Sequence, residues 1–170
     1  MKNSALYSFL ILSSVLITSC KEDDPEPLKA QTQAVLLAGE PGSSKTWKLT
    51  GGTQQVNAGG VVPQTFDPCQ LDDLFTFSNN EAQSYEMRGG ASKCDAADPD
   101  QLESGTWAFT LNGTMVIILS NKTAISGLFN FYALPFPAEV VSLTDSAMKL
   151  KLVVIDDGNT FTFIFDFTKA

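Results

Sequence analysis

The stretch MKLKLVVIDDGNTFTFIFDF, residues 148–167, decides the fold that we predict for this chain. It holds two alternating apolar segments on either side of Asp157-Gly158, a pair that favours the type I′ turn of a two-residue β-hairpin. The turn chemistry, the alternation and the charges agree on one register, so the sequence predicts an antiparallel strand pair whose phenylalanines face the interior. The expected cross-strand pairs are Val154 with Phe161, Leu152 with Phe163, Leu150 with Phe165, and Lys149 with Asp166.

The same pattern of short alternating segments separated by turn residues begins at Thr46. Gly51-Gly52 indicates a bend in the first segment, and Asn112-Gly113 predicts a second type I′ hairpin that pairs Trp107 with Ile118. A segment at 125–134 is apolar on both faces. About eight antiparallel strands in sequence order favour an all-β, up-and-down β-barrel without open edges. A two-sheet sandwich, the alternative, normally needs longer connections between its sheets.

One short helix is expected ahead of the strands. Residues 28–38 are rich in Ala, Leu and Gln, and Gly39 and Pro41 supply a stop signal. Helical spacing places Leu28, Thr32, Val35 and Leu36 on one face.

The N-terminal residues have the form of an export signal. An apolar run at 6–17 follows Lys2 and is too short to span a bilayer. It ends in Leu16-Ile17-Thr18-Ser19-Cys20, which resembles the lipobox of bacterial lipoproteins. The resemblance implies that Cys20 is acylated and becomes the first residue of the mature chain. We therefore expect a signal peptide at 1–19, a lipidated tether with the short helix at 20–43, and the barrel at 44–170.

The tether suggests where the protein resides. Lys21-Glu22-Asp23-Asp24, directly after Cys20, resembles the surface-export signal of Bacteroidetes lipoproteins. It implies an outer-membrane protein, lipid-anchored and facing the cell surface. The alternative is a plain acidic spacer on a periplasm-facing anchor.

Charge and composition exclude several classes of function. Eleven basic residues stand against 19 acidic ones, which argues against a nucleic-acid partner and against electrostatic docking on anionic lipid. Attachment to a membrane would have to come from acyl chains on Cys20. The chain has no histidine, so Ser-His-Asp catalysis and His-ligated metal sites are excluded. We expect no enzyme, no metal and no cofactor.

The other two cysteines favour a disulfide. If Cys20 carries lipid, Cys69 and Cys94 remain in an oxidising compartment. A bridge would close a loop of about 26 residues and stabilise the fold by roughly 3.5 kcal/mol on the chain-entropy estimate. Two free thiols, or a pair of metal-binding thiolates, are the weaker alternatives.

Several short motifs are similar to those of the lipocalin-like lipoproteins of Bacteroidetes. The residues that carry this resemblance are Lys45-Thr46-Trp47-Lys48-Leu49, Cys69-Gln70-Leu71-Asp72-Asp73 leading into Phe75-Thr76-Phe77, Cys94, and Gly105-Thr106-Trp107. The resemblance spans residues 36–167 in pattern. It implies a lipocalin-like barrel rather than a particular activity.

Inward-facing aromatic residues are the candidate ligand-binding site. In a barrel of eight strands they either line a pocket for a small apolar ligand or fill a solid core. The second possibility makes the protein a structural or interaction protein that contacts an envelope protein or a glycan. The candidate residues are Tyr85, Trp107, Phe129, Phe131, Phe163 and Phe165.

Two further motifs have both a functional and a plain interpretation. Four acids gather at 95–103, where a calcium site is conceivable and a solvated acidic loop is favoured. Asp145-Ser146-Ala147 resembles the O-glycosylation acceptor of Bacteroidetes, with Ser146 as the acceptor, although a match of three residues arises easily by chance. The four acids are Asp95, Asp98, Asp100 and Glu103.

Overall fold

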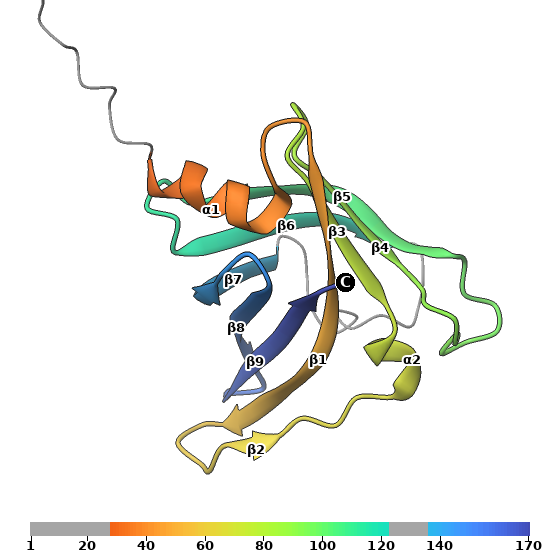
Figure 1. Cartoon of the computed structure of the whole chain (residues 1–170). Coiled ribbons are helices and arrows are strands. Elements are labelled where there is room, and N and C mark those ends of the chain that lie inside the picture. Colours follow the sequence, from red (N-terminus) through yellow and green to blue (C-terminus); the bar gives the residue numbers. More distant parts are fainter. Residues whose placement is uncertain (1–27, 123–135) are drawn as a thin grey trace, which may run out of the picture.

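A computed structural model of the chain describes residues 28–122 and 136–170 (Figure 1). Every pair of neighbouring strands in its sheet is antiparallel, and β1 also pairs with β9. This pairing closes β1 and β3–β9 into an eight-stranded barrel, with β2 as a short addition, so the predicted up-and-down barrel is confirmed. The elements are α1 (Lys29–Ala38), β1 (Ser44–Val56), β2 (Val62–Pro63), α2 (Pro68–Leu71), β3 (Leu74–Ser78), β4 (Ser84–Arg88), β5 (Gln101–Phe109), β6 (Met115–Lys122), β7 (Phe136–Leu143), β8 (Ala147–Asp156) and β9 (Asn159–Lys169).

The β8–β9 hairpin has the predicted register. Asp157 and Gly158 have φ angles of 45° and 78°, as a type I′ turn requires. Leu150 pairs with Phe165, Leu152 with Phe163, and Lys149 with Asp166. All three pairs are those expected from the sequence.

The β5–β6 hairpin has the predicted register but a different turn. Trp107 pairs with Ile118 as expected, yet only Gly113 of the Asn112-Gly113 pair has a positive φ, at 65°. The Gly113 N–H donates to the Thr110 carbonyl at 2.7 Å, which gives a four-residue loop. The Asn112 side-chain oxygen accepts from the hydroxyls of Thr110 and Thr114, both at 2.8 Å. These bonds stabilise the wider loop, so the type I′ prediction was wrong here.

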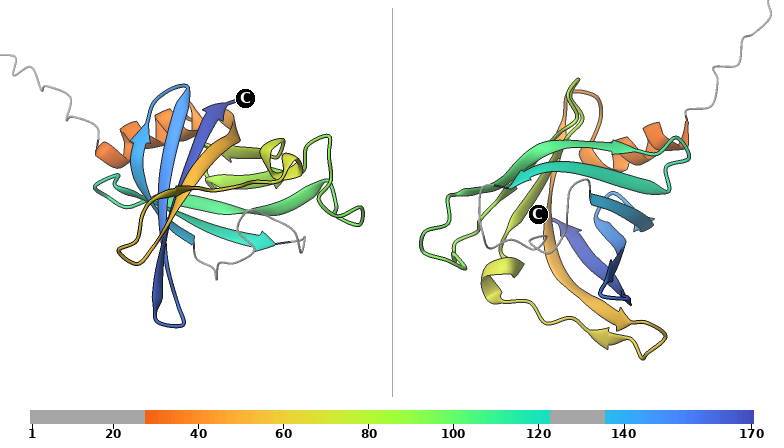
Figure 2. Two further views of the ribbon diagram at one scale, coloured as in Figure 1. Left: turned by 90° about the horizontal axis from the view of Figure 1, so that it is seen from below. Right: turned by 180° about the vertical axis from the view of Figure 1, so that it is seen from behind.

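The barrel has two ends with different connections (Figures 1 and 2). The helix end carries α1 and the turns at 79–83, 110–114 and 144–146. The disulfide end carries α2, the β4–β5 connection at 89–100 and the β8–β9 turn. The predicted apolar strand at 125–134 lies outside the described residues.

Helix α1 is fixed to the helix end through its C-terminal carbonyls. The Trp47 indole N–H donates to the Leu37 carbonyl at 2.8 Å, and Lys45 Nζ donates to the Leu36 carbonyl at 2.9 Å. Carbonyls at a helix C-terminus lack partners within the helix, so both bonds satisfy groups that would otherwise be unpaired. In the described part of the chain, no helix has the length and apolar character needed to cross a bilayer.

The predicted helix is confirmed, and its buried residues lie at its C-terminal end. Leu37 and Ala38 are buried, whereas Leu28 is 57% exposed. The helix turns its C-terminal residues toward the core because Trp47 and Lys45 bind that end.

The core is densest toward the helix end. Phe75 meets Phe167 edge to face at 5.4 Å, and Trp107 meets Phe77 at 6.2 Å in the same geometry. Such T-shaped contacts are favourable arrangements of aromatic rings. The largest fully buried side chains are Trp47, Trp107, Tyr85, Phe75, Phe77, Leu37, Leu49, Met87 and Val116.

Candidate functional site

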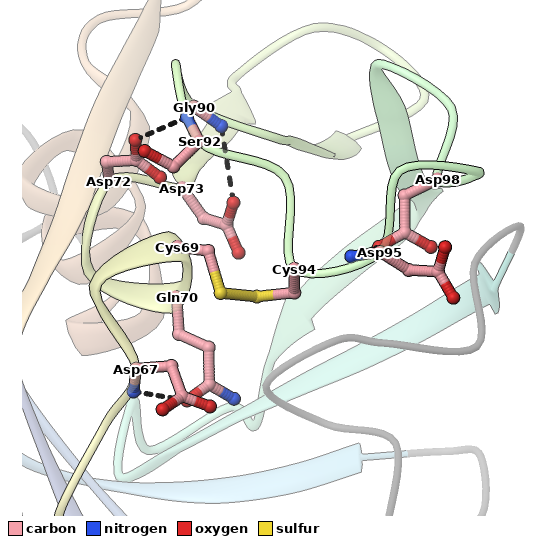
Figure 3. The surroundings of a disulfide bond; sticks show 10 residues. All are labelled: Asp67, Cys69, Gln70, Asp72, Asp73, Gly90, Ser92, Cys94, Asp95 and Asp98. Atoms are coloured by element: carbon pink, nitrogen blue, oxygen red, sulfur yellow. Dashed lines mark hydrogen bonds between the residues drawn. A yellow bond between two sulfur atoms is a disulfide. The ribbon is translucent and has the colours of Figure 1, made fainter.

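A disulfide joins α2 to the β4–β5 connection (Figure 3). Cys69 and Cys94 are bonded, with their Cα atoms 5.3 Å apart and a sequence separation of 25 residues. The predicted bridge is confirmed, and the free-thiol and metal-pair alternatives were wrong. The bond holds two segments of the disulfide end together.

Helix α2 was not predicted, although the sequence contains its signal. Pro68 occupies the first turn, and the Asp67 backbone N–H donates to the Gln70 side-chain oxygen at 2.9 Å. Pro in the first turn and a glutamine three residues after an aspartate are typical of a helix N-terminus. The helix presents Cys69 toward the neighbouring connection.

Two adjacent aspartates bind the same connection. The Ser92 N–H donates to Asp72 Oδ2 at 2.9 Å, and the Gly90 N–H donates to Asp73 Oδ1 at 3.3 Å (Figure 3). A Cβ atom on Gly90 would lie 2.4 Å from the Asp72 carbonyl oxygen. Glycine is therefore needed at position 90 for this close approach.

A polar cluster of Asp73, Tyr85 and Glu103 lies inside the barrel along β3, β4 and β5. Asp73 and Glu103 lie toward the disulfide end, and the Tyr85 ring packs 5.1 Å from that of Phe77. Their exposed fractions are 4%, 2% and 2%. In the β4–β5 ladder Tyr85 pairs with Gly105, and Met87 pairs with Glu103. Tyr85 and Glu103 are therefore diagonal neighbours on the same inward face. We call these three residues the interior polar cluster.

The hydroxyl of Tyr85 is buried and unpaired. Among the described residues, none forms a hydrogen bond with it. A buried polar atom without a partner typically costs about 1–3 kcal/mol. This hydroxyl is therefore a place where a bound polar group would find an unused hydrogen-bond partner.

Burial changes the acidity of the cluster. It raises the pKa of Asp73 from 3.8 to about 7; the Gly90 N–H opposes this change, and the charges of Asp72 and Asp98 reinforce it. Burial likewise raises the pKa of Tyr85 well above its ordinary value, and the carboxylates of Glu103 and Asp73 add to the effect. Tyr85 is therefore a neutral phenol at physiological pH.

The four acids of the 95–103 segment do not form one solvated loop. Asp95 and Asp100 are exposed as expected, but Asp98 is buried and Glu103 lies on β5 facing the interior. Lys93 Nζ lies 3.0 Å from Asp100 Oδ1 and 2.7 Å from the Asp98 carbonyl oxygen. The prediction of a solvated loop was wrong for Asp98 and Glu103. Across residues 28–122 and 136–170, no group of three or more acids, cysteines or histidines is arranged to hold a metal ion.

A row of aromatic rings runs along β9 at the disulfide end. Phe161, Phe163 and Phe165 stack in sequence, with ring centroids 6.4 Å and 6.1 Å apart. Burial falls along the row, because Phe165 is 3% exposed while Phe163 and Phe161 are only half-buried. We call these three rings the phenylalanine row.

Phe66, which was not singled out in the sequence, joins this row. It lies between β2 and α2, and its ring centroid is 6.2 Å from that of Phe165. A Cβ atom on Gly52 would lie 3.3 Å from the Phe66 ring and 2.4 Å from the Ile164 carbonyl oxygen. The β1–β9 register shifts between Leu49 and Gly51, directly before the predicted bend, and the absence of a Cβ atom on Gly52 leaves space for the Phe66 ring.

The remaining candidate residues are spread over the molecule. Trp107 lies toward the helix end, 5.8 Å from the ring of Phe109. Ser146 is exposed in the β7–β8 turn next to Asp145. Lys45 Nζ lies 2.7 Å from Asp145 and lowers the pKa of its carboxyl. Phe129, Phe131 and Cys20 lie outside the described residues.

A comparison with protein families agrees with the geometry of the fold. Residues 44–150, more than half of the chain, match the lipocalin-like domain family. No curated protein sequence matches the chain. A crystal structure of the vaccine antigen transferrin binding protein B from Haemophilus parasuis Hp5, as a tryptophan-to-alanine mutant, aligns with a TM-score of 0.39 and 8% sequence identity. The alignment covers 76% of this chain and 27% of that chain, and a similarity of this degree carries no conclusion about function.

Proposed function

This chain belongs to the lipocalin-like domain family, and we propose that it is a non-catalytic, lipid-anchored cell-envelope protein that binds a small apolar ligand inside its barrel. The binding site in this proposal is the disulfide end of the interior. Its residues are Phe163 and Phe165 from the sequence-based set, joined by Phe66, and Tyr85 lies farther along the interior, against Phe77. Trp107 lies in the densely packed half of the barrel, so the proposal does not place it in contact with the ligand.

The observation that carries the proposal is the fall in burial along the phenylalanine row. Inward rings toward the helix end, such as Phe167 and Phe75, are almost fully buried, whereas Phe163 and Phe161 keep exposed surface. Apolar surface that faces a barrel interior and stays exposed favours an apolar ligand, because each buried Å² contributes about 25 cal/mol.

The proposed anchor sets the orientation of the barrel. Seven residues lie between Cys20 and Leu28, so the Cα atoms of these two residues are at most about 28 Å apart. Acyl chains on Cys20 would hold the helix end near the outer membrane and leave the disulfide end facing away. We place the protein on the cell surface, with a periplasm-facing anchor as the alternative.

The ligand is tested by native mass spectrometry and by solvent extraction of the purified full chain. We expect a co-purifying apolar molecule whose occupancy falls in Phe163→Ala. Phe109→Ala is the matched control, because Phe109 is also half-buried but lies near the helix end. Absence of any bound molecule, together with no uptake of added fatty alcohols, would count against the binding function.

The anchor is tested separately with labelled palmitate. The wild-type chain should incorporate the label, and Cys20→Ala should not. Protease treatment of intact cells then distinguishes the surface from the periplasmic face. Incorporation of label into Cys20→Ala would refute the anchor and leave the ligand proposal standing.

A second candidate function is favoured by the dense packing near α1. Trp47, Trp107 and Phe77 are almost fully buried there, as in a solid core. In this alternative the barrel is a scaffold that contacts an envelope protein or a glycan, and no molecule occupies its interior. The extraction experiment separates the two candidates.

Ser146 is a proposed modification site within either function. Its hydroxyl sits in an exposed turn, where a modifying enzyme has access. Intact-mass measurement should show a glycan that is lost in Ser146→Ala. An unmodified wild-type mass would refute the assignment.

A further inference from the structure

Two large apolar side chains are exposed at one corner of the helix end. Leu28, directly before α1, is 57% exposed, and Leu111, in the turn between β5 and β6, is 83% exposed. We propose that these two residues, which we call the leucine pair, insert into the interfacial layer of the membrane that carries the anchor. The inference rests on the proposed acylation of Cys20 and goes beyond it, because it assigns the barrel a lipid-contacting surface of its own.

The leucine pair occupies one corner because α1 packs on the β5–β6 turn. A Cβ atom on Gly113 would lie 3.1 Å from the backbone carbonyl carbon of Lys29 and 3.1 Å from its side chain. Lys29 follows Leu28 directly, and Gly113 lies two residues after Leu111, so both leucines flank this contact. Figures 1 and 2 both show the start of α1 beside the turn between β5 and β6.

The turn that carries Leu111 is suited to leaving water. The Asn112 side-chain oxygen accepts from the hydroxyls of Thr110 and Thr114, both at 2.8 Å, and the Gly113 N–H donates to the Thr110 carbonyl at 2.7 Å. Polar groups that are already paired lose less free energy on transfer from water to the apolar boundary of a bilayer. The same bonds hold the turn in one conformation, so its insertion costs little conformational entropy.

The charges around the leucine pair do not oppose contact with lipid. Helix α1 and residues 104–119 contain no acidic residue, although the whole chain has 19. Lys29 is exposed beside the pair, and a lysine at a membrane interface extends its charge toward water and phosphate while its methylene groups stay in the apolar layer. At the opposite end of the barrel Ile155 is 76% exposed, but Asp156-Asp157 follows it directly. The charges therefore favour the helix end for contact with lipid.

The tether makes so small a surface sufficient. Two leucines bury too little apolar area to hold a free acidic protein on a membrane. An acylated Cys20 would keep Leu28 within at most about 28 Å of the bilayer surface. Insertion then becomes an intramolecular step at an effective concentration that is roughly millimolar, so a weak contact is populated once the anchor is in place. The leucine pair sets the orientation of the barrel, and the acyl chains supply the attachment.

Photo-labelling by lipid tests the inference on the full, acylated chain. The chain is reconstituted in phosphatidylcholine vesicles that contain a phospholipid with a diazirine on its acyl chain, and labelled peptides are mapped by mass spectrometry after irradiation. We expect the peptides that contain Leu28 and Leu111 to be labelled at least about fivefold more than the peptide that contains Ile155.

Serine variants at exposed positions provide the matched comparison. Leu28→Ser combined with Leu111→Ser should reduce labelling of the two peptides about fivefold or more. Ile155→Ser removes an equally exposed apolar side chain at the other end and should change that labelling less than about twofold. All three side chains are exposed, so urea denaturation should show the same stability in every variant. Adding phosphatidylglycerol to the vesicles should also change the labelling less than about twofold, because the contact is apolar.

Failure of the inference and failure of the anchor give different results. If the chain floats with the vesicles but the two leucine peptides are labelled no more than the Ile155 peptide, the inference is overturned and the anchor stands. Labelling that survives the double serine variant overturns it as well. If the wild-type chain does not float with the vesicles, the acyl anchor and the inference both fail.

Discussion

At the C-terminus of α1 the helix carbonyls are paired with core side chains, whereas on β4 the phenol of Tyr85 is buried without a hydrogen-bond partner among the described residues. The Trp47 indole and Lys45 satisfy the carbonyls of α1, and the Asn79 amide donates to the Gly39 carbonyl at 2.7 Å. Inside the barrel, Tyr85 has no hydrogen-bond partner among the described residues, and toward the disulfide end burial raises the pKa of Asp73.

The difference indicates that one part of the sheet contributes mainly to stability and another part to function. A barrel selected for stability alone would fill its interior with apolar side chains, because buried acids destabilise a fold. Here the helix end supplies dense packing, and the disulfide adds a covalent constraint where the polar groups weaken the core. The loss of stability caused by buried polar groups is therefore what we expect in a functional region.

The largest expected effect is at the helix end. Trp47→Ala removes a fully buried ring and its bond to Leu37, and we expect a loss of about 3–5 kcal/mol in the free energy of unfolding. Phe163→Ala, at the half-buried row, should lose about 1–2 kcal/mol. Urea denaturation measures both. Equal losses would contradict the contrast between the two ends.

Loss of the disulfide is expected to have the second-largest effect on the free energy of unfolding. Replacing both Cys69 and Cys94 by alanine should destabilise the chain by about 2–4 kcal/mol, because the unfolded chain regains the entropy of the closed loop. Urea denaturation of the wild type with and without reductant provides an independent measure. Alkylation of both cysteines in the unreduced protein would show that the bridge is absent.

Gly90→Ala tests the close approach at the disulfide end. A Cβ atom at position 90 would lie 2.4 Å from the Asp72 carbonyl oxygen. The backbone shift that relieves this contact should lower the free energy of unfolding by about 1–3 kcal/mol. Gly89→Ala is the neighbouring control, since its Cβ would meet no atom closer than 3.9 Å. A thermal melt in which both variants match the wild type would refute the steric argument.

The smallest effect expected is a pH dependence due to Asp73. Its pKa is raised to about 7 by burial, with added contributions from Asp72 and Asp98 and an opposing one from the Gly90 N–H. The folded state then binds more protons than the unfolded state between pH 4 and pH 7, so stability should fall as pH rises through this window. We expect a fall of about 1–2 kcal/mol after allowance for solvent screening, and Asp73→Asn should flatten the profile.

Asp145 provides a control of opposite sign. Lys45 lowers the pKa of this exposed carboxyl, so its contribution is present above pH 4 and is lost as pH falls. Asp145→Asn should therefore leave the decline between pH 4 and pH 7 in place. A flattened profile in that variant would show that the slope does not come from Asp73.

Much of the sheet follows from signals between near neighbours in sequence. Asp157-Gly158 and the alternation around it determine the β8–β9 register, because turn geometry and side-chain period leave one choice. Asn112-Gly113 gave the right register and the wrong turn, since the side chain of Asn112 binds hydroxyls that a turn rule does not consider.

The interior polar cluster could not be predicted in the same way. Asp73 and Glu103 look like surface acids in the sequence, and their burial depends on the bulge near Met87 and on the alignment of three strands. The bond from Trp47 to Leu37 and the ring of Phe66 over Gly52 likewise depend on contacts between separate segments. Tyr85 was singled out as an aromatic side chain, and its lack of a hydrogen-bond partner among the described residues likewise depends on the strands around it.

Closure of the barrel by β1 and β9 has a consequence for folding. The two strands are separated by more than 100 residues, from Val56 to Asn159, so their pairing is among the last contacts that a growing chain can make. Until β9 emerges, β1 exposes one edge of unpaired backbone groups, which is the kind of surface that recruits other strands. Slow synthesis of the C-terminal hairpin would therefore prolong the period in which this chain is most prone to aggregate.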